Sequence, residues 1–94
     1  MAKTLVPLMT SEKTTMTTDA AVTLITVPAG ARYTHALFGN YSEYDALVSI
    51  DGGTTWFLVG GGETKGLEDV QIWQTVQVKN ATAGENCVVN AEIW

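Results

Sequence analysis

The sequence has little of several residue types, and each scarcity argues against a class of site. Cys87 is the only cysteine of the 94 residues, so no internal disulfide can form. His35 is the only histidine, whereas a zinc site needs about four ligands, so we expect no metal and no cofactor. The net charge is −5, and the five cations are scattered along the chain: Lys3, Lys13, Arg32, Lys65 and Lys79. Because phosphate-binding surfaces need clustered cations, we expect neither nucleic-acid binding nor binding to an anionic membrane.

Long apolar runs are also missing from the sequence. Residues 1–9 contain a short apolar stretch that Pro7 interrupts, whereas a secretory leader needs about 7–15 apolar residues. No stretch approaches the roughly 20 apolar residues of a membrane-spanning helix. The sequence therefore predicts a soluble protein that is made in a cytoplasm.

Charge is sparse for so short a chain, which forms one domain with a modest core. Charged residues make up 16% of the sequence and hydrophobic residues 46%, so uncharged polar residues must supply much of the surface. This balance favours a surface that is partly covered by neighbours, and association would supplement the stability of a small core. A simple threonine-rich β domain has the same composition and remains the alternative.

The segment from Ser49 to Trp56 has the residues of a tight β-hairpin. Gly52 and Gly53 can take the positive φ angles that a primed turn requires. The carboxylate of Asp51 can accept hydrogen bonds from the amides of its own turn. Trp56 can then fold back over the turn and bury its ring. We predict a structural hairpin whose key residues are Ser49, Asp51, Gly53, Thr55 and Trp56.

The spacing Ser-x-Asp-x-Gly-x-Thr-Trp in this segment resembles the Asp-box hairpin, which recurs in sialidases and in several unrelated β proteins. In those families the motif is structural and lies away from the active site. The resemblance therefore implies a β-sheet protein and gives no support to a glycosidase. Because no catalytic motif stands elsewhere in the sequence, we predict that the protein is not an enzyme.

Short β-rich runs separated by turn residues follow at regular intervals after residue 20. The expected strands are residues 21–27, 32–38, 46–50, 55–59, the alternating part of 67–79, and 87–94. No segment combines helix caps with a helical period of apolar residues. We therefore expect an all-β fold, a β-sandwich or jelly roll of about six to eight short antiparallel strands.

The alternation within these runs predicts which side chains share a face. In residues 32–38 it places Tyr33, His35 and Leu37 together, opposite Ala36 and Phe38. Residues 39–43 are expected to form a loop, and the three glycines at 60–62 a flexible connection. In the last strand one face is apolar, formed by Cys87, Val89, Ala91 and Ile93.

Residues 1–19 differ in composition from the rest, so we divide the chain into an extended N-terminal arm or edge strand (1–19) and a β-sandwich domain (20–94). Threonine favours extended backbone, and Pro7 can pair only at a sheet edge. A frayed terminus is the alternative. Removing residues 1–19 is expected to leave the body folded. The arm would contact a partner through four apolar residues: Leu5, Val6, Leu8 and Met9.

Two groups of side chains allow other functions. The carboxylates of Glu43 and Asp45 would suit a calcium site or a glycosidase, as would those of Glu68 and Asp69, although such loop acids are usually solvated turn residues. Tyr41 and Tyr44 lie in one predicted loop and can stack on a sugar ring or contact a partner protein. Aromatic residues in so small a domain more often form the core or subunit contacts, which is the interpretation that we favour.

A pattern of turns and strands over residues 20–94 resembles the small β-sandwich proteins of tailed-phage virions. It comprises Val27–Arg32, Asn40–Ser42, the Asp-Gly-Gly hairpin, Val76–Asn80 and the terminal Trp94. Such proteins decorate the capsid as cement or form part of the tail or fibres. The resemblance implies a capsid decoration protein on the virion surface, bound to the major capsid protein or another virion protein, and a homo-oligomer with a trimer favoured. The alternative is a carbohydrate-binding or receptor-binding module of a phage tail or fibre.

Overall fold

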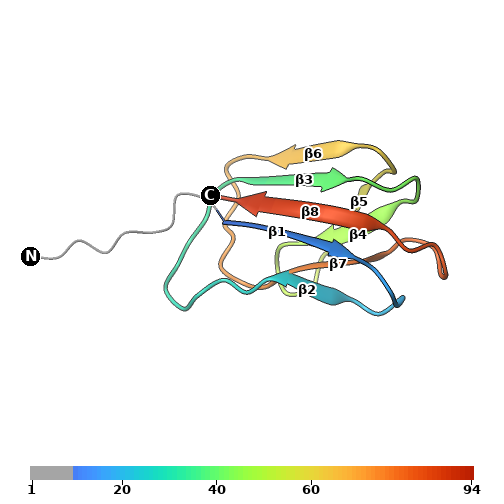
Figure 1. Cartoon of the computed structure of the whole chain (residues 1–94). Helices are drawn as coiled ribbons and strands as arrows, with labels where there is room; N and C mark the ends of the chain where they lie inside the picture. The colour runs from blue at the N-terminus through green and yellow to red at the C-terminus, as the bar shows by residue number, and fades with distance from the viewer. Residues whose placement is uncertain (1–9) are drawn as a thin grey trace, which may run out of the picture.

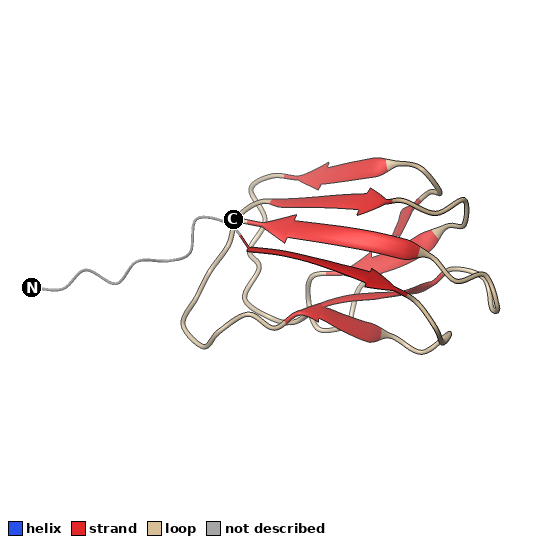
Figure 2. Cartoon of the chain, viewed as in Figure 1, coloured by secondary structure: helices blue, strands red, loops and turns tan. Residues whose placement is uncertain are grey.

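A computed structural model describes residues 10–94 of the chain. These residues form eight β-strands joined by loops, and no part of them is helical (Figure 2). Accordingly, no helix among residues 10–94 is long and apolar enough to cross a membrane. The strands are β1 (Thr10–Thr15), β2 (Val22–Ile25), β3 (Ala36–Asn40), β4 (Ala46–Ser49), β5 (Phe57–Val59), β6 (Thr64–Leu67), β7 (Val76–Asn80) and β8 (Val88–Ile93).

The strands form two four-stranded antiparallel sheets that face each other (Figure 1). One sheet has the order β1-β8-β3-β6 and the other the order β2-β7-β4-β5. Four of the strand pairs are those of one long hairpin: β1–β8, β2–β7, β3–β6 and β4–β5. The hairpin wraps around itself, which adds the pairs β3–β8 and β4–β7. This is the jelly-roll arrangement, so the predicted fold class is confirmed.

The core lies between the two sheets and is built from strand residues that alternate inward and outward. In β8 the predicted apolar face is buried, whereas Val88, Asn90 and Glu92 on the other face are half-buried. Phe38 and Phe57 meet edge to face across the core with ring centroids 5.6 Å apart. The largest fully buried side chains besides Phe38 are Tyr33, Met16, Ile72 and Ile93.

A β-bulge before β3 overturns the face predicted for Tyr33. The amides of Thr34 and His35 both donate to the carbonyl oxygen of Trp94, at 2.9 and 3.0 Å, so two residues oppose one. The extra residue shifts the alternation by one position. Tyr33 and Ala36 therefore both point into the core, and the prediction that Tyr33 shares a face with Leu37 is wrong.

Two connections are more ordered than predicted. Residues 39 and 40 belong to β3 rather than to a loop, and residues 64–67 form β6. The predicted flexible glycine segment is a defined turn, in which the amide of Glu63 donates to the carbonyl oxygen of Gly60 at 2.9 Å. The amide of Gly61 donates to the Asp45 carboxylate at 3.0 Å, and a Cβ on Gly61 would meet the Glu43 carbonyl group at 2.5 Å. Glycine is needed there for close backbone approach.

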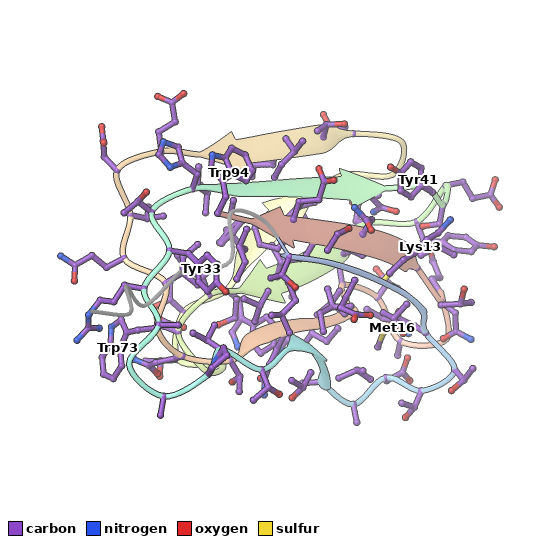
Figure 3. All side chains as sticks on the ribbon, turned by 60° about the vertical axis from the view of Figure 1, so that its left-hand side comes forward. Lys13, Met16, Tyr33, Tyr41, Trp73 and Trp94 are labelled. Atoms are coloured by element: carbon purple, nitrogen blue, oxygen red, sulfur yellow. The ribbon has the colours of Figure 1, made fainter. Side chains whose placement is uncertain are left out.

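The boundary predicted at residue 19 does not separate an arm from the body. Residues 10–15 form β1, an edge strand that pairs along its whole length with β8, and Met16 is buried in the core (Figures 1 and 3). The Asp19 carboxylate accepts hydrogen bonds from the Asn80 side chain and the Gly84 amide, which lower its pKa below the ordinary value of 3.8. Residues 10–15 therefore match the edge-strand alternative, and we now expect removal of residues 1–19 to destabilise the body, because it deletes β1 and the core side chain of Met16.

The side chain of Asn40 ties the two sheets together at one end. Asn40 is buried at the end of β3, and its amide nitrogen donates to the carbonyl oxygens of Tyr44 and Val59 at 2.7 and 3.0 Å. Its carbonyl oxygen accepts from the amide and hydroxyl of Ser42 at 3.0 and 2.7 Å. Because Val59 lies in β5, one buried amide joins both sheets and fixes the loop between β3 and β4.

We predict that Asn40→Ala lowers the free energy of unfolding by about 2–4 kcal/mol, because the buried bond to the Val59 carbonyl oxygen is lost and the loop from Tyr41 to Tyr44 loses its bonds to the Asn40 side chain. Asn90→Ala is a matched control in the adjacent strand, because Asn90 is half-exposed and accepts one weak bond from Ser11 at 3.3 Å. Its expected effect is below about 0.5 kcal/mol. Urea denaturation of the parent protein and the two variants measures the free energy of unfolding of each. An equal decrease in the two variants would contradict the linking role of Asn40.

Candidate functional site

The Ser49–Trp56 segment has the positive φ angles and the Asp51 hydrogen bonds that its residues predict, but it is not a tight primed turn: the last pair of the β4–β5 ladder is Val48 with Phe57, so residues 49–56 form a longer loop. Gly52 and Gly53 have φ angles of 72° and 94°. The Asp51 carboxylate accepts hydrogen bonds from the amides of Thr54 and Thr55 at 3.1 and 2.8 Å and from the Ser49 hydroxyl at 2.7 Å. The bonds from the Thr55 amide and the other turn donors hold the pKa of Asp51 below its ordinary value of 3.8.

Trp56 folds back over this turn and closes it. Its indole nitrogen donates to the carbonyl oxygen of Gly53 at 3.0 Å, and the ring is half-buried. The Lys79 ammonium nitrogen lies 4.3 Å from the centroid of the ring. The turn is further joined to the chain before β7 by a bond from the Gly52 amide to the Thr75 carbonyl oxygen at 3.0 Å. All these contacts are internal, so the hairpin acts as a structural element.

The surface of the described residues carries four exposed large apolar side chains. The exposed fractions are 65% for Tyr41, 52% for Leu58, 52% for Trp73 and 37% for Trp94. Trp73 and Trp94 occupy the end of the sandwich where β1 begins and β8 ends, on either side of the buried Tyr33 (Figure 3). Tryptophan and tyrosine are enriched at protein interfaces, so these side chains are the strongest candidates for partner contacts.

The two tryptophans are held in fixed positions. The ring of Trp94 stacks on His35 with centroids 5.3 Å apart and an interplanar angle of 8°. The Arg32 guanidinium carbon lies 5.3 Å from the ring centroid of Trp73. Preorganised aromatic side chains lose less conformational entropy on binding, which favours their use as anchors.

Every cation among residues 10–94 lies over an aromatic ring. Besides the pairs made by Arg32 and Lys79, the ammonium nitrogen of Lys13 is 4.8 Å from the ring centroid of Tyr41, and that of Lys65 is 5.8 Å from the centroid of Phe57. Each of these four cations therefore contacts a different aromatic side chain.

Tyr41 and Tyr44 both lie in the loop between β3 and β4, but their side chains differ in exposure and surroundings. The Tyr41 ring lies back over Gly39 of β3, because a Cβ on that glycine would meet the ring at 3.3 Å. Tyr44 is half-buried, and its hydrogen bond to Glu43 raises the pKa of its hydroxyl above the ordinary value of 10.0. Among the described residues the two aromatic ring pairs are His35–Trp94 and Phe38–Phe57, so the rings of Tyr41 and Tyr44 do not stack on each other.

The other candidate residues are the loop carboxylates that would suit a metal, Cys87 and the apolar anchors. Within residues 10–94, no three His, Cys, Asp or Glu side chains gather closely enough to hold a metal ion. The thiol of Cys87 is buried and donates to the Asn80 side-chain oxygen at 3.3 Å, and burial raises the pKa of this thiol. The predicted apolar anchors Leu5, Val6, Leu8 and Met9 lie outside the described residues.

Comparison with known proteins assigns no relative. No protein-family model and no curated protein matches the chain. The surface residues therefore carry the functional argument alone. The sequence did not lead us to predict Leu58, Trp73 or Trp94 as contact residues. The signal for the two tryptophans was their alternation with polar residues, because Trp73 falls on the same face as Gln71 and Thr75, and Trp94 on the same face as Asn90 and Glu92.

We predict that Asp51→Ala lowers the free energy of unfolding by about 1–3 kcal/mol at neutral pH, because the turn amides lose their acceptor. Asp51→Asn keeps one acceptor oxygen and removes the charge, so its loss should be smaller. Because the pKa of Asp51 is depressed in the fold, the stability from its charge is present above pH 3.8 and lost as the pH falls through the folded pKa.

Denaturant melts of the parent and of Asp51→Asn from pH 7 to pH 2 check this dependence. The gap between the two proteins should narrow as the pH falls below 3.8. A gap that stays constant over the whole range would show that the ionised carboxylate does not hold the turn.

Proposed function

We propose that the protein is a non-enzymatic structural component of a phage virion, most specifically a capsid decoration (cement) protein on the head surface. Its partners would be further copies of itself, with a trimer favoured, and the major capsid protein or another virion protein. The fold is compatible with this role, since jelly rolls are common in capsid proteins, but fold alone does not carry function.

The observation that carries the proposal is the pair of exposed tryptophans at one end of the sandwich. Trp73 and Trp94 are positioned by Arg32 and His35, and both lie at the end where β1 starts (Figure 3). The predicted apolar anchors belong to residues 1–9, which precede β1 in the sequence and lie outside the described residues. Rigid, exposed aromatic side chains suit attachment to a large protein surface.

Carbohydrate or receptor binding is the second candidate function, and the exposure of Tyr41 supports it. The ring is 65% exposed and lies on the outer face of the β1-β8-β3-β6 sheet. Exposed aromatic faces stack on sugar rings. Tyr44 in the same loop is half-buried, so a sugar site would depend mainly on the ring of Tyr41.

Binding of the purified protein to capsids that lack it separates the two candidates. Trp73→Ala and Trp94→Ala should each weaken capsid attachment about tenfold or more, because rigid aromatic anchors dominate interfaces. Tyr41→Ala removes an exposed aromatic side chain away from that end, so it is the matched control and should bind capsids normally. Deletion of residues 1–9 preserves β1 and should also weaken attachment.

Binding of the same variants to a glycan array completes the test. Undiminished capsid attachment by both tryptophan variants, together with glycan binding that is lost in Tyr41→Ala, would overturn the cement proposal in favour of a sugar-binding module.

A further inference from the structure

The β1-β8-β3-β6 sheet has two open edges. β1 and β6 are its outer strands, and within residues 10–94 neither pairs with a strand of the second sheet (Figure 1). Apart from the half-buried Thr10, Thr14 and Leu67, the residues of both strands are exposed. An exposed strand edge offers unpaired backbone groups to another strand.

The hydrogen-bond alternation shows which backbone groups face outward. The bond from the Met16 amide to the Cys87 carbonyl oxygen continues the ladder between β1 and β8. The bond from the Asn40 amide to the Glu63 carbonyl oxygen continues the ladder between β3 and β6. Because antiparallel pairs alternate between bonded and non-bonded, the even-numbered residues of β1 and the odd-numbered residues of β6 bond inside the sheet. The outward groups are therefore those of Ser11, Lys13 and Thr15 on β1, and of Thr64 and Gly66 on β6.

A single cross-strand row connects one charge on each edge. The register pairs Glu12 with Ala91, Ala91 with Phe38, and Phe38 with Lys65. These four residues therefore lie side by side on the inner face of the sheet. The row begins with an exposed acid on β1 and ends with an exposed base on β6.

We propose that the edge of β6 is a docking site for β1 of a second copy of this chain, so that the sheet continues from one copy to the next. β1 and β6 run in opposite directions, because β1 is antiparallel to β8, β8 to β3 and β3 to β6. Continuing the rows sets Gly66 opposite Ser11 and Thr64 opposite Lys13 as bonded pairs. Lys65 then faces Glu12 of the second copy in a non-bonded pair, where side chains are closest.

Charge also selects this pairing against symmetric ones. Two antiparallel β6 strands related by a two-fold axis at Lys65 place Lys65 opposite the Lys65 of the other copy. Two β1 strands related by an axis at Glu12 or at Lys13 likewise place like charges opposite each other. Like charges directly opposite destabilise a sheet pair. A charge that points inward at an edge protects against indiscriminate pairing, and complementary charges in one row admit the correct partner.

The interface is head-to-tail, because each copy uses β6 toward one neighbour and β1 toward the other. Such contacts form closed rings or open filaments. The proposal rests on the self-association proposed above and does not depend on attachment to a virion.

Sedimentation of Glu12→Lys, Lys65→Glu and the double exchange tests the pairing, with circular dichroism to verify folding. Each single variant should weaken self-association about tenfold, because an attractive pair becomes repulsive. The double exchange should restore it. Glu92→Lys is the matched control: Glu92 lies in the central strand β8, and its exchange changes the net charge as Glu12→Lys does. This control should associate like the parent protein.

Mixing the two single variants gives a sharper result. The Glu12→Lys variant carries a lysine on both edges, and the Lys65→Glu variant carries a glutamate on both edges. Opposite charges therefore meet only where the two variants alternate, so any closed ring that the mixture forms should contain an even number of copies. Ser11→Pro provides an independent test, because it removes an outward N–H group and leaves the ladder to β8 intact. It should weaken association without unfolding the protein.

Equal association of the parent and all folded edge variants would overturn this interface and leave self-association standing. A parent protein that is monomeric at every concentration, yet still attaches to capsids, would overturn both the interface and self-association in solution while leaving the capsid proposal intact. Failure of the double exchange to recover what the single variants lose would overturn the pairing of Glu12 with Lys65.

Discussion

The antiparallel pairing of β1 with β8 is the constraint on which the rest of the structure depends, because it joins the first described strand to the last and closes the roll. β8 is held between β1 and β3, and its inward side chains form the centre of the core. The turn after β1 then places Met16 under the sheets and brings Asp19 to Asn80. Without this pair the inner face of β8 would lose one flank.

Closing the roll in this way places the exposed tryptophans at one end of the sandwich and leaves two open edges on one sheet. Trp94 follows β8 directly, and its carbonyl oxygen binds both amides of the bulge at Thr34 and His35. The same bulge turns Tyr33 inward, where it pairs with Ile72 next to Trp73. One irregularity in the ladder therefore fixes the end of the sandwich that displays both tryptophans. The two sides of the sheet remain as open edges, and the charges on their inner face are opposite: Glu12 on β1 and Lys65 on β6.

Local signals in the sequence predicted much of this fold, whereas features that depend on distant partners were not predictable. The hydrogen bonds of Asp51 and the fold-back of Trp56 were predicted correctly, because their donors and acceptors lie within eight residues. The length of the loop was not, because it depends on where the ladder of β4 and β5 ends. The alternation of β8 was equally clear. The bulge was not visible, because it requires the Trp94 carbonyl oxygen some 60 residues later in the chain. β6 was missed because Thr64–Leu67 has little intrinsic preference for a strand and becomes one by pairing with β3. The exposure of Trp73 and Trp94 was implied by their polar neighbours, but their positions at one end required the fold.

Imaging of an intact particle that carries this protein would test the central claim most directly. The account predicts that residues 10–94 appear on the outer surface of the head, with the Trp73 and Trp94 end toward the capsid and β6 of one copy beside β1 of the next. Absence of the protein from the head surface, or isolated copies whose tryptophan end faces solvent, would contradict it.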